Sequence, residues 1–271
     1  MIKKNIDLKL TTQGPPYPPS EIMDADGNFV VIGNVIQPDL SMKWTSAIVG
    51  ADSPVPEFGK LAPYRVVRYL SSDELATSDA VLYTLSLPLP CNNYPLVFAP
   101  EQVPNAHSIV RPSKPLHDAW IPDIRPNDGR KVTQPITLRQ WCRAKGNLSL
   151  EVGDDYAIFD FAFEGMIPNS LYTVMTLRRH NIRPQNPTRP GPLGIPNVFI
   201  ADSAGRGTYS ARMPNPFPTG ENADRIIDVI VLWISSQMSF GGAIGHHGLG
   251  GDVHAQLKSG PAPFEGLATK G

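Results

Sequence analysis

The chain has 271 residues and a formal net charge of −1, which is long enough to bury a sizeable core and not basic enough to favour nucleic acid as a partner. No run of about eighteen apolar residues occurs, so we expect no membrane span. Proline contributes 29 residues and glycine 23. Because proline interrupts helices and confines strands to short pieces, this composition predicts short strands and ordered loops.

The N-terminal region, residues 1–133, is predicted to be a proline-rich β region followed by a connector. Its proline-rich segment at 11–20 favours an extended arm or a linker. The run from Asp24 to Asn28 has the Asp-x-Asp-Gly pattern of a calcium loop, but the remaining ligands of such a loop are missing. We therefore expect a turn there, directly before a strand that starts at Phe29.

Two strands and a helical turn are predicted next. The strands are expected at 64–70 and 81–87. A helical turn at 71–75 separates them, since Ser71 has the form of a helix cap. From 88 to 135 prolines recur every few residues, which predicts a long ordered loop with little regular structure.

The region 134–258 is predicted to form one β domain, followed by a C-terminal tail at 259–271. A short helix at 135–141, with Thr137 as its cap, opens this domain. The strands that follow are expected at 148–152, 158–163, 171–177, 198–201, 208–213, 226–234 and 252–257. Because no helices of useful length separate these strands, we predict an all-β fold. It is an antiparallel β-sandwich or jelly roll with long proline-rich loops and one or two short helices.

Three features indicate how these strands pack. Phe159, Phe161 and Phe163 alternate with other residues along one strand, which predicts an aromatic face toward a core. The strand at 226–234 is apolar on both faces and is expected at the centre of a sheet. The two strands around the glycine-containing turn at 202–207 are predicted to form a hairpin.

Three stretches of the C-terminal half, 141–146, 165–174 and 202–207, resemble a loose group of uncharacterised bacterial β-sandwich proteins. Those proteins are commonly secreted. They share a "G-L-x-P-x-x-x-Y-T-L" strand, an "A-D-A-x-G-x-G" hairpin and a closing strand with histidines. The resemblance covers about half of the chain. It implies a β-sandwich over 134–258 and implies no activity.

The location expected from the N-terminus is cytoplasmic, since Lys3 and Lys4 are not followed by the apolar segment of a signal peptide. The alternative is a secreted protein whose signal peptide is not part of this sequence. Cys91 and Cys142 leave two states open, one disulfide or two separate reduced thiols.

The densest chemistry of the sequence lies in a glycine-rich run near the C-terminus. With a strand at 252–257, alternation places Asp252 and His254 on a polar face, opposite the apolar residues of that strand. Glycines in the preceding loop would let His246 or His247 approach His254. Imidazoles with a carboxylate suit zinc, copper or iron, so these four residues form a predicted metal site. The alternatives are acid–base chemistry without a metal and a surface loop whose histidines are solvated.

A basic segment offers a second candidate site. Arg178, Arg179 and Arg183 lie in a proline-rich stretch with no acidic residue before Asp202. Arginines in such a cluster could clamp a carboxylate or a phosphate. The alternative is a loop that is solvated or contacts another subunit.

Two function hypotheses follow. The first is a non-catalytic, β-rich ligand-binding or assembly protein, with a small molecule, other copies of the chain or assembly neighbours as partners. The alternative is a small histidine-site enzyme, either with a divalent transition metal (zinc, copper or iron) or without one, with its site at the end of the sandwich. Nucleotide-binding glycine motifs and a serine nucleophile elbow are absent from the sequence.

Overall fold

The computed structural model describes residues 1–14, 19–86, 110–119, 128–240, 245 and 247–267. Within these ranges most elements are strands, and every pair of strands is antiparallel, which confirms the all-β prediction. The helical elements of the described residues are short: α1 (Ser72–Thr77), η2 (Leu116–Asp118), α3 (Leu138–Trp141) and η3 (Arg179–Ile182). None of the helices in those ranges is long and apolar enough to cross a membrane.

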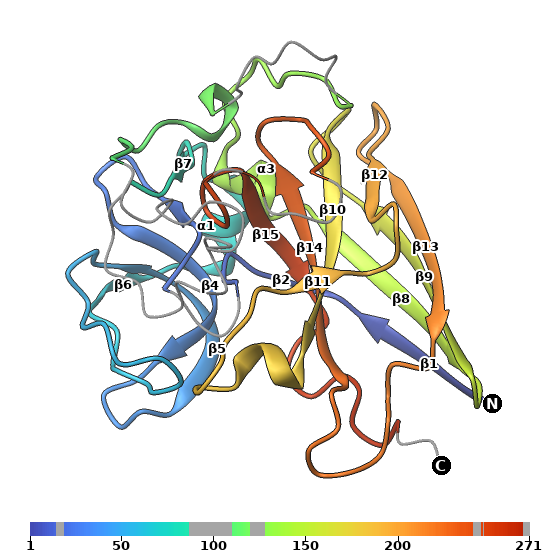
Figure 1. Ribbon diagram of the computed structural model, residues 1–271. Coiled ribbons are helices and arrows are strands. Elements are labelled where there is room, and N and C mark those ends of the chain that lie inside the picture. Colours follow the sequence, from blue (N-terminus) through green and yellow to red (C-terminus); the bar gives the residue numbers. More distant parts are fainter. Residues whose placement is uncertain (15–18, 87–109, 120–127, 241–244, 246, 268–271) are drawn as a thin grey trace.

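The strands form three sheets (Figure 1). Sheet A has the order β1 (Ile2–Asp7), β8 (Lys145–Val152), β9 (Tyr156–Glu164), β13 (Gly207–Pro214). Sheet B has the order β11 (Gly191–Pro192), β10 (Leu171–Arg178), β14 (Ile226–Ile234), β15 (Val253–Lys258), β2 (Lys9–Leu10), and β12 (Val198–Ile200) also pairs with β10. Sheet C has the order β6 (Val66–Tyr69), β5 (Met42–Val49), β4 (Phe29–Ile36), β3 (Ile22–Met23), β7 (Tyr83–Thr84).

The main core lies between sheets A and B and is rich in aromatic side chains. Phe159, Phe161 and Phe163 are all buried, as their alternation predicts. Phe199 from sheet B stacks on Phe163 with ring centroids 4.5 Å apart, and on Tyr172 at 5.2 Å. Stacked and edge-on aromatic pairs stabilise a core beyond the area they bury. The two sheets therefore form the predicted β-sandwich.

Local sequence signals set several boundaries correctly. Ser71 and Thr137 cap α1 and α3, each with a reciprocal bond to the glutamate or glutamine three residues later. The turn after Asp24 forms as expected, with the carboxylate of Asp24 accepting the backbone N–H of Asp26 and Asn28. The central position of β14, between β10 and β15, is also confirmed.

One prediction about connectivity is wrong. The strands at 198–201 and 208–213 do not form a hairpin, because β12 pairs with β10 in sheet B and β13 pairs with β9 in sheet A. The turn between them carries the chain from one layer of the sandwich to the other. Two N-terminal strands join the sheets of the sandwich, since β1 pairs with β8 and β2 pairs with β15, and the division of the chain at residue 133 stays a prediction. Most of the connector predicted at 88–135 lies outside the described residues.

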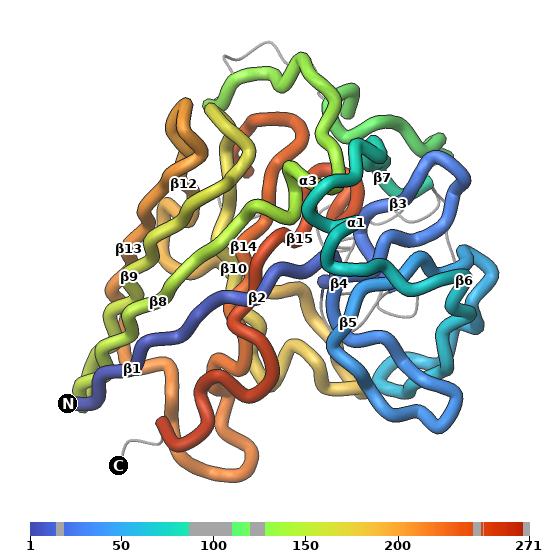
Figure 2. Tube along the Cα trace, turned by 180° about the vertical axis from the view of Figure 1, so that it is seen from behind, coloured from blue at the N-terminus to red at the C-terminus, as the bar shows by residue number. Residues whose placement is uncertain are grey.

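The segment after β2 joins the sandwich to sheet C. Thr11 donates its backbone N–H to the carbonyl of Gln256 on β15, at 2.9 Å. The next residue, Thr12, donates its backbone N–H to Ile32 of β4 at 3.0 Å, and its hydroxyl accepts the N–H of Ile32 at 2.8 Å. Figure 2 shows this path, with β1 running along the sandwich and continuing through β2 toward β4. Sheet C is therefore held beside the edge of sheet B that carries β15.

Candidate functional site

The histidine face of β15 is buried, which contradicts the sequence prediction of a polar face. Every residue of β15 is buried, and His254 has no exposed surface. His254 lies opposite Trp233 on β14, and the two ring centroids are 5.6 Å apart. The expectation failed because this face of β15 packs into the core of the sandwich beside Trp233, which no local pattern in 252–257 indicates.

A β-bulge also changes which residues of β15 share a face. Val231 lies opposite Leu257, but the next residue, Leu232, lies opposite Ala255, so Gln256 is the extra residue. Leu257 therefore belongs to the sandwich core, whereas Ala255 belongs to a second apolar cluster on the other face of sheet B. Simple alternation predicted that both faced the same way.

Burial sets the protonation of the groups around His254. It lowers the pKa of His254 to about 3, with the nearby Arg111 guanidinium acting in the same direction. Neither ring nitrogen of His254 has a hydrogen-bond partner among the described residues. Burial also lowers the pKa of Arg111 to about 10, opposed by Asp252. At neutral pH His254 is uncharged, so it lacks the titration near neutrality that acid–base use was expected to exploit.

Glu21 closes the edge of the sheet beside this histidine. Its Oε2 accepts the backbone N–H of Ala255 at 2.5 Å, a bond that a neighbouring strand would otherwise make. Its Oε1 has no partner within the described part of the chain. Burial raises the pKa of Glu21 from 4.5 to about 8, and the Lys258 charge opposes the shift. The carboxyl group is therefore mostly protonated at neutral pH.

The predicted metal site gains no support from the described residues, which hold no group of three or more metal-binding side chains. His247 and Asp252 do lie together, but through the backbone N–H of His247, which donates to Asp252 Oδ2 at 2.5 Å. His246 lies outside the described residues. The four-residue site with His254 stays a prediction.

The three predicted ligand-binding arginines donate to one loop. Arg178 Nη1 lies 3.1 Å from the carbonyl oxygen of Asp224, and Arg183 Nη2 lies 3.2 Å from that of Asn222. Arg179 Nη1 donates to the carbonyl of Glu221 at 2.6 Å. These bonds hold the segment 220–224 against η3. A role in ligand binding stays a prediction for all three.

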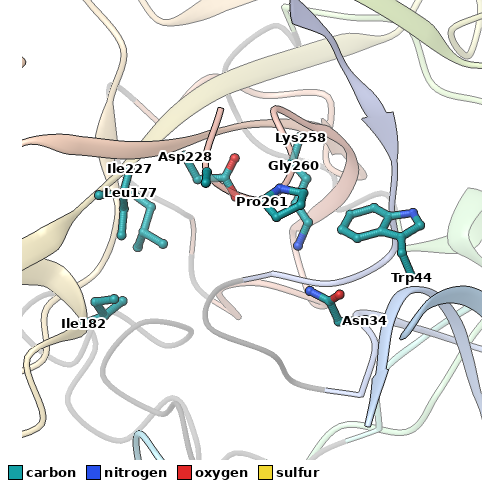
Figure 3. A pocket seen from close by; sticks show the side chains of 10 residues that line it. Asn34, Trp44, Leu177, Ile182, Ile227, Asp228, Lys258, Gly260 and Pro261 are labelled. Carbon is teal, nitrogen blue, oxygen red and sulfur yellow. The ribbon is translucent and has the colours of Figure 1, made fainter. Parts of the chain in front are cut away.

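A pocket that the sequence does not predict lies between sheets B and C (Figure 3). Its volume is about 250 Å³. The residues that line it come from β4, β5, β10, η3, β14, β15 and the segment after β15: Asn34, Trp44, Leu177, Ile182, Ile227, Asp228, Lys258, Gly260, Pro261 and Ala262. The pocket combines an indole ring, aliphatic walls, one amine and one carboxyl group.

Two lysines lie beside the indole ring of this pocket. Lys258 Nζ is 5.3 Å from the centroid of Trp44, and Lys9 Nζ is 5.1 Å from it. Both distances are within the range of a cation–π contact. Lys9 and Lys258 come together because they are directly opposite in the pairing of β2 with β15. Lys9 is exposed, whereas Lys258 is only 4 % exposed.

The buried charges of the pocket influence each other. Burial lowers the pKa of Lys258, while Asp228 and Glu21 act to raise it. Burial raises the pKa of Asp228, and Lys258 opposes this. Asp228 Oδ1 accepts the hydroxyl of Ser259 at 2.6 Å and the backbone N–H of Val229 at 2.9 Å. These bonds fix the carboxyl group at the wall of the pocket.

A scan against protein-family models finds no match for the chain. A search of curated proteins also finds no match.

Proposed function

We propose that the protein is a non-catalytic, β-rich ligand-binding protein whose pocket between sheets B and C takes a small planar organic anion. The observation that carries this proposal is the presence of two lysine side chains, exposed Lys9 and buried Lys258, beside the ring of Trp44 at the pocket. An indole ring offers a flat apolar surface, and ammonium groups favour a carboxylate or phosphate nearby.

The walls support the same ligand class. Leu177, Ile182 and Ile227 line the side away from Trp44 and suit an apolar body. Ligand pockets commonly combine such walls with a few polar groups that fix orientation. The volume of about 250 Å³ is below the roughly 300–1,000 Å³ of sites for drug-sized ligands. An aromatic or conjugated carboxylate of one ring is the size of ligand that this space suits.

Calorimetric titration with benzoate tests the proposal, with benzyl alcohol as the uncharged comparison. We expect benzoate to bind and benzyl alcohol to bind at least tenfold more weakly. Trp44→Ala and Lys258→Met should each weaken benzoate binding at least tenfold. Lys43→Met is the matched control, because Lys43 is an exposed neighbour of Trp44 on β5 that does not line the pocket.

Circular dichroism should show that each variant keeps the β fold. Of Trp44→Ala and Lys258→Met, Trp44→Ala is expected to disturb the fold less, because Trp44 is only partly buried. No benzoate binding at millimolar concentrations, or equal binding by the wild type and Trp44→Ala, would contradict the proposal. The alternative of a histidine-site enzyme has less support, because His254 is fully buried and the described residues hold no group of three or more metal-binding side chains.

A further inference from the structure

We propose, building on the ligand-binding function above, that Lys258 captures its ligand through a reversible imine bond. The ligand class is then narrower than an organic anion: a planar aldehyde or ketone that also carries an anionic group. The geometry behind the proposal is a nearly fully buried primary amine and a carboxyl group, Asp228, that line the same pocket.

The surroundings of Lys258 favour an amine that reacts rather than one that only attracts charge. Figure 3 shows its nitrogen reaching toward Asn34 and Trp44, with Pro261 and Asp228 on the other side. The low exposure of Lys258, 4 %, disfavours the charged ammonium form, as burial does for lysines that form imines in proteins. Lys9 is exposed, and its Nζ lies over the indole ring of Trp44. Lys9 is therefore placed to hold the anionic group of the ligand.

Imine formation needs no oxidant or reductant, because the bonds that form and the bonds that break balance. The nitrogen lone pair of neutral Lys258 forms a C–N bond with the carbonyl carbon, while the C=O electrons move to oxygen. One proton passes from nitrogen to that oxygen, which gives a carbinolamine. The carboxyl group of Asp228 then donates a proton to the hydroxyl group, water leaves, and the C=N bond forms. The iminium nitrogen returns a proton to the Asp228 carboxylate, so the net products are an imine and one water molecule.

The pH dependence follows from the groups that act on Lys258. Asp228 and Glu21 hold its pKa up, burial brings it down, and the charge of Lys9 lies beside the same indole ring. The net direction is a lowered pKa, so the neutral amine is present at lower pH than for an exposed lysine. Imine formation should therefore be measurable near neutral pH and should rise as the pH rises through the lowered pKa of Lys258.

The test is reductive trapping on the full chain with 4-formylbenzoate, which has a planar ring, a carboxylate and an aldehyde. The protein is incubated with the probe, reduced with borohydride and mapped by peptide mass spectrometry. We expect the adduct on Lys258 to form at least tenfold faster than on Lys43 or Lys9. An excess of benzoate should slow the reaction at Lys258 and leave the other lysines unaffected.

Two variants keep the test falsifiable. Lys258→Arg keeps the positive charge but cannot form an imine, so it should bind benzoate and give no adduct at position 258. Asp228→Asn should slow trapping at least tenfold while benzoate binding persists. Benzoate binding without selective trapping at Lys258 would overturn the imine and leave the proposed function intact. Loss of both would overturn the proposed function as well.

Discussion

Glu21 makes a quantitative prediction about stability and pH. Its carboxyl group is fully buried, and its pKa is raised from 4.5 to about 8. Between these two values the folded chain keeps a proton that the unfolded chain releases, so stability falls as the pH rises through this window. At about 1.36 kcal/mol per pKa unit, the loss from Glu21 between pH 4.5 and pH 8 is roughly 4 kcal/mol.

Glu21→Gln should remove this dependence. A glutamine cannot ionise, and its side-chain oxygen can still accept the backbone N–H of Ala255, which Glu21 Oε2 accepts at 2.5 Å. Urea unfolding at pH 4.5, 6.2 and 8 measures the free energy of unfolding of both proteins. The wild type should lose roughly 4 kcal/mol more than the variant between the lowest and highest pH.

Glu164→Gln is the matched control for this experiment, because Glu164 is an exposed residue of β9. Its pH profile of stability should run parallel to that of the wild type. Equal slopes for the wild type and Glu21→Gln between pH 4.5 and pH 8 would refute the reasoning. That result would mean that Glu21 reaches water, or is ionised in the folded chain well below pH 8.

Four further predictions use buried or partly buried side chains. His254→Ala should cost roughly 3 kcal/mol of unfolding free energy in urea, because the ring is fully buried against Trp233; an unchanged stability would show that the imidazole is not packed there. Since burial lowers the pKa of His254 to about 3, its contribution to stability should be lost as the pH falls from 6.5 toward 3, and His254→Ala should show a flatter acid limb. Phe161→Ala should cost roughly 3–5 kcal/mol, as the ring stacks on Phe163 at 5.7 Å, and a cost near zero would contradict the packing of the sandwich. Burial raises the pKa of the free thiol Cys142 to about 12, so a thiol reagent should label it at pH 8 far more slowly in the native protein than in urea, with equal rates as the contrary outcome.

Features that depend on neighbours in sequence could be predicted from the sequence. The alternation of Phe159, Phe161 and Phe163 defines a strand and its buried face without any knowledge of the rest of the chain. The caps at Ser71 and Thr137 are equally local, because each involves a residue only three positions away. Such signals locate elements along the chain, and the structure confirms them.

Features that depend on distant pairing could not be predicted in this way. The turn after Ile200 has the glycines of a hairpin, but it connects strands of different sheets, since β12 and β13 find other partners. The pocket depends even more strongly on contacts between distant parts of the chain. Trp44 and Lys258 meet only because sheet C lies beside β15. Neither residue is unusual within its own stretch of sequence, so no short motif marks the pocket.

The bulge at Gln256 connects the two misjudged features of β15. Without it, alternation from His254, which faces the sandwich core beside Trp233, would turn Lys258 toward that same core. Because of the extra residue, Leu257 and Lys258 exchange the faces that simple alternation gives them, and Leu257 enters the core. Lys258 then lies opposite Ile230, on the face of β14 that also carries Asp228 two residues earlier. A charge that would be untenable between the sheets is thereby placed against a carboxyl group and the ring of Trp44. Deleting Gln256 would leave a regular ladder in which Leu257 still lies opposite Val231 and Lys258 still lies opposite Ile230, so the amine would stay on the pocket face. We therefore expect the deletion variant and Gln256→Ala both to retain benzoate binding, at a cost in stability because the buried side chain of Gln256 bonds Tyr172 and the carbonyl of Trp141; a folded deletion variant that does not bind benzoate would contradict this account of the register.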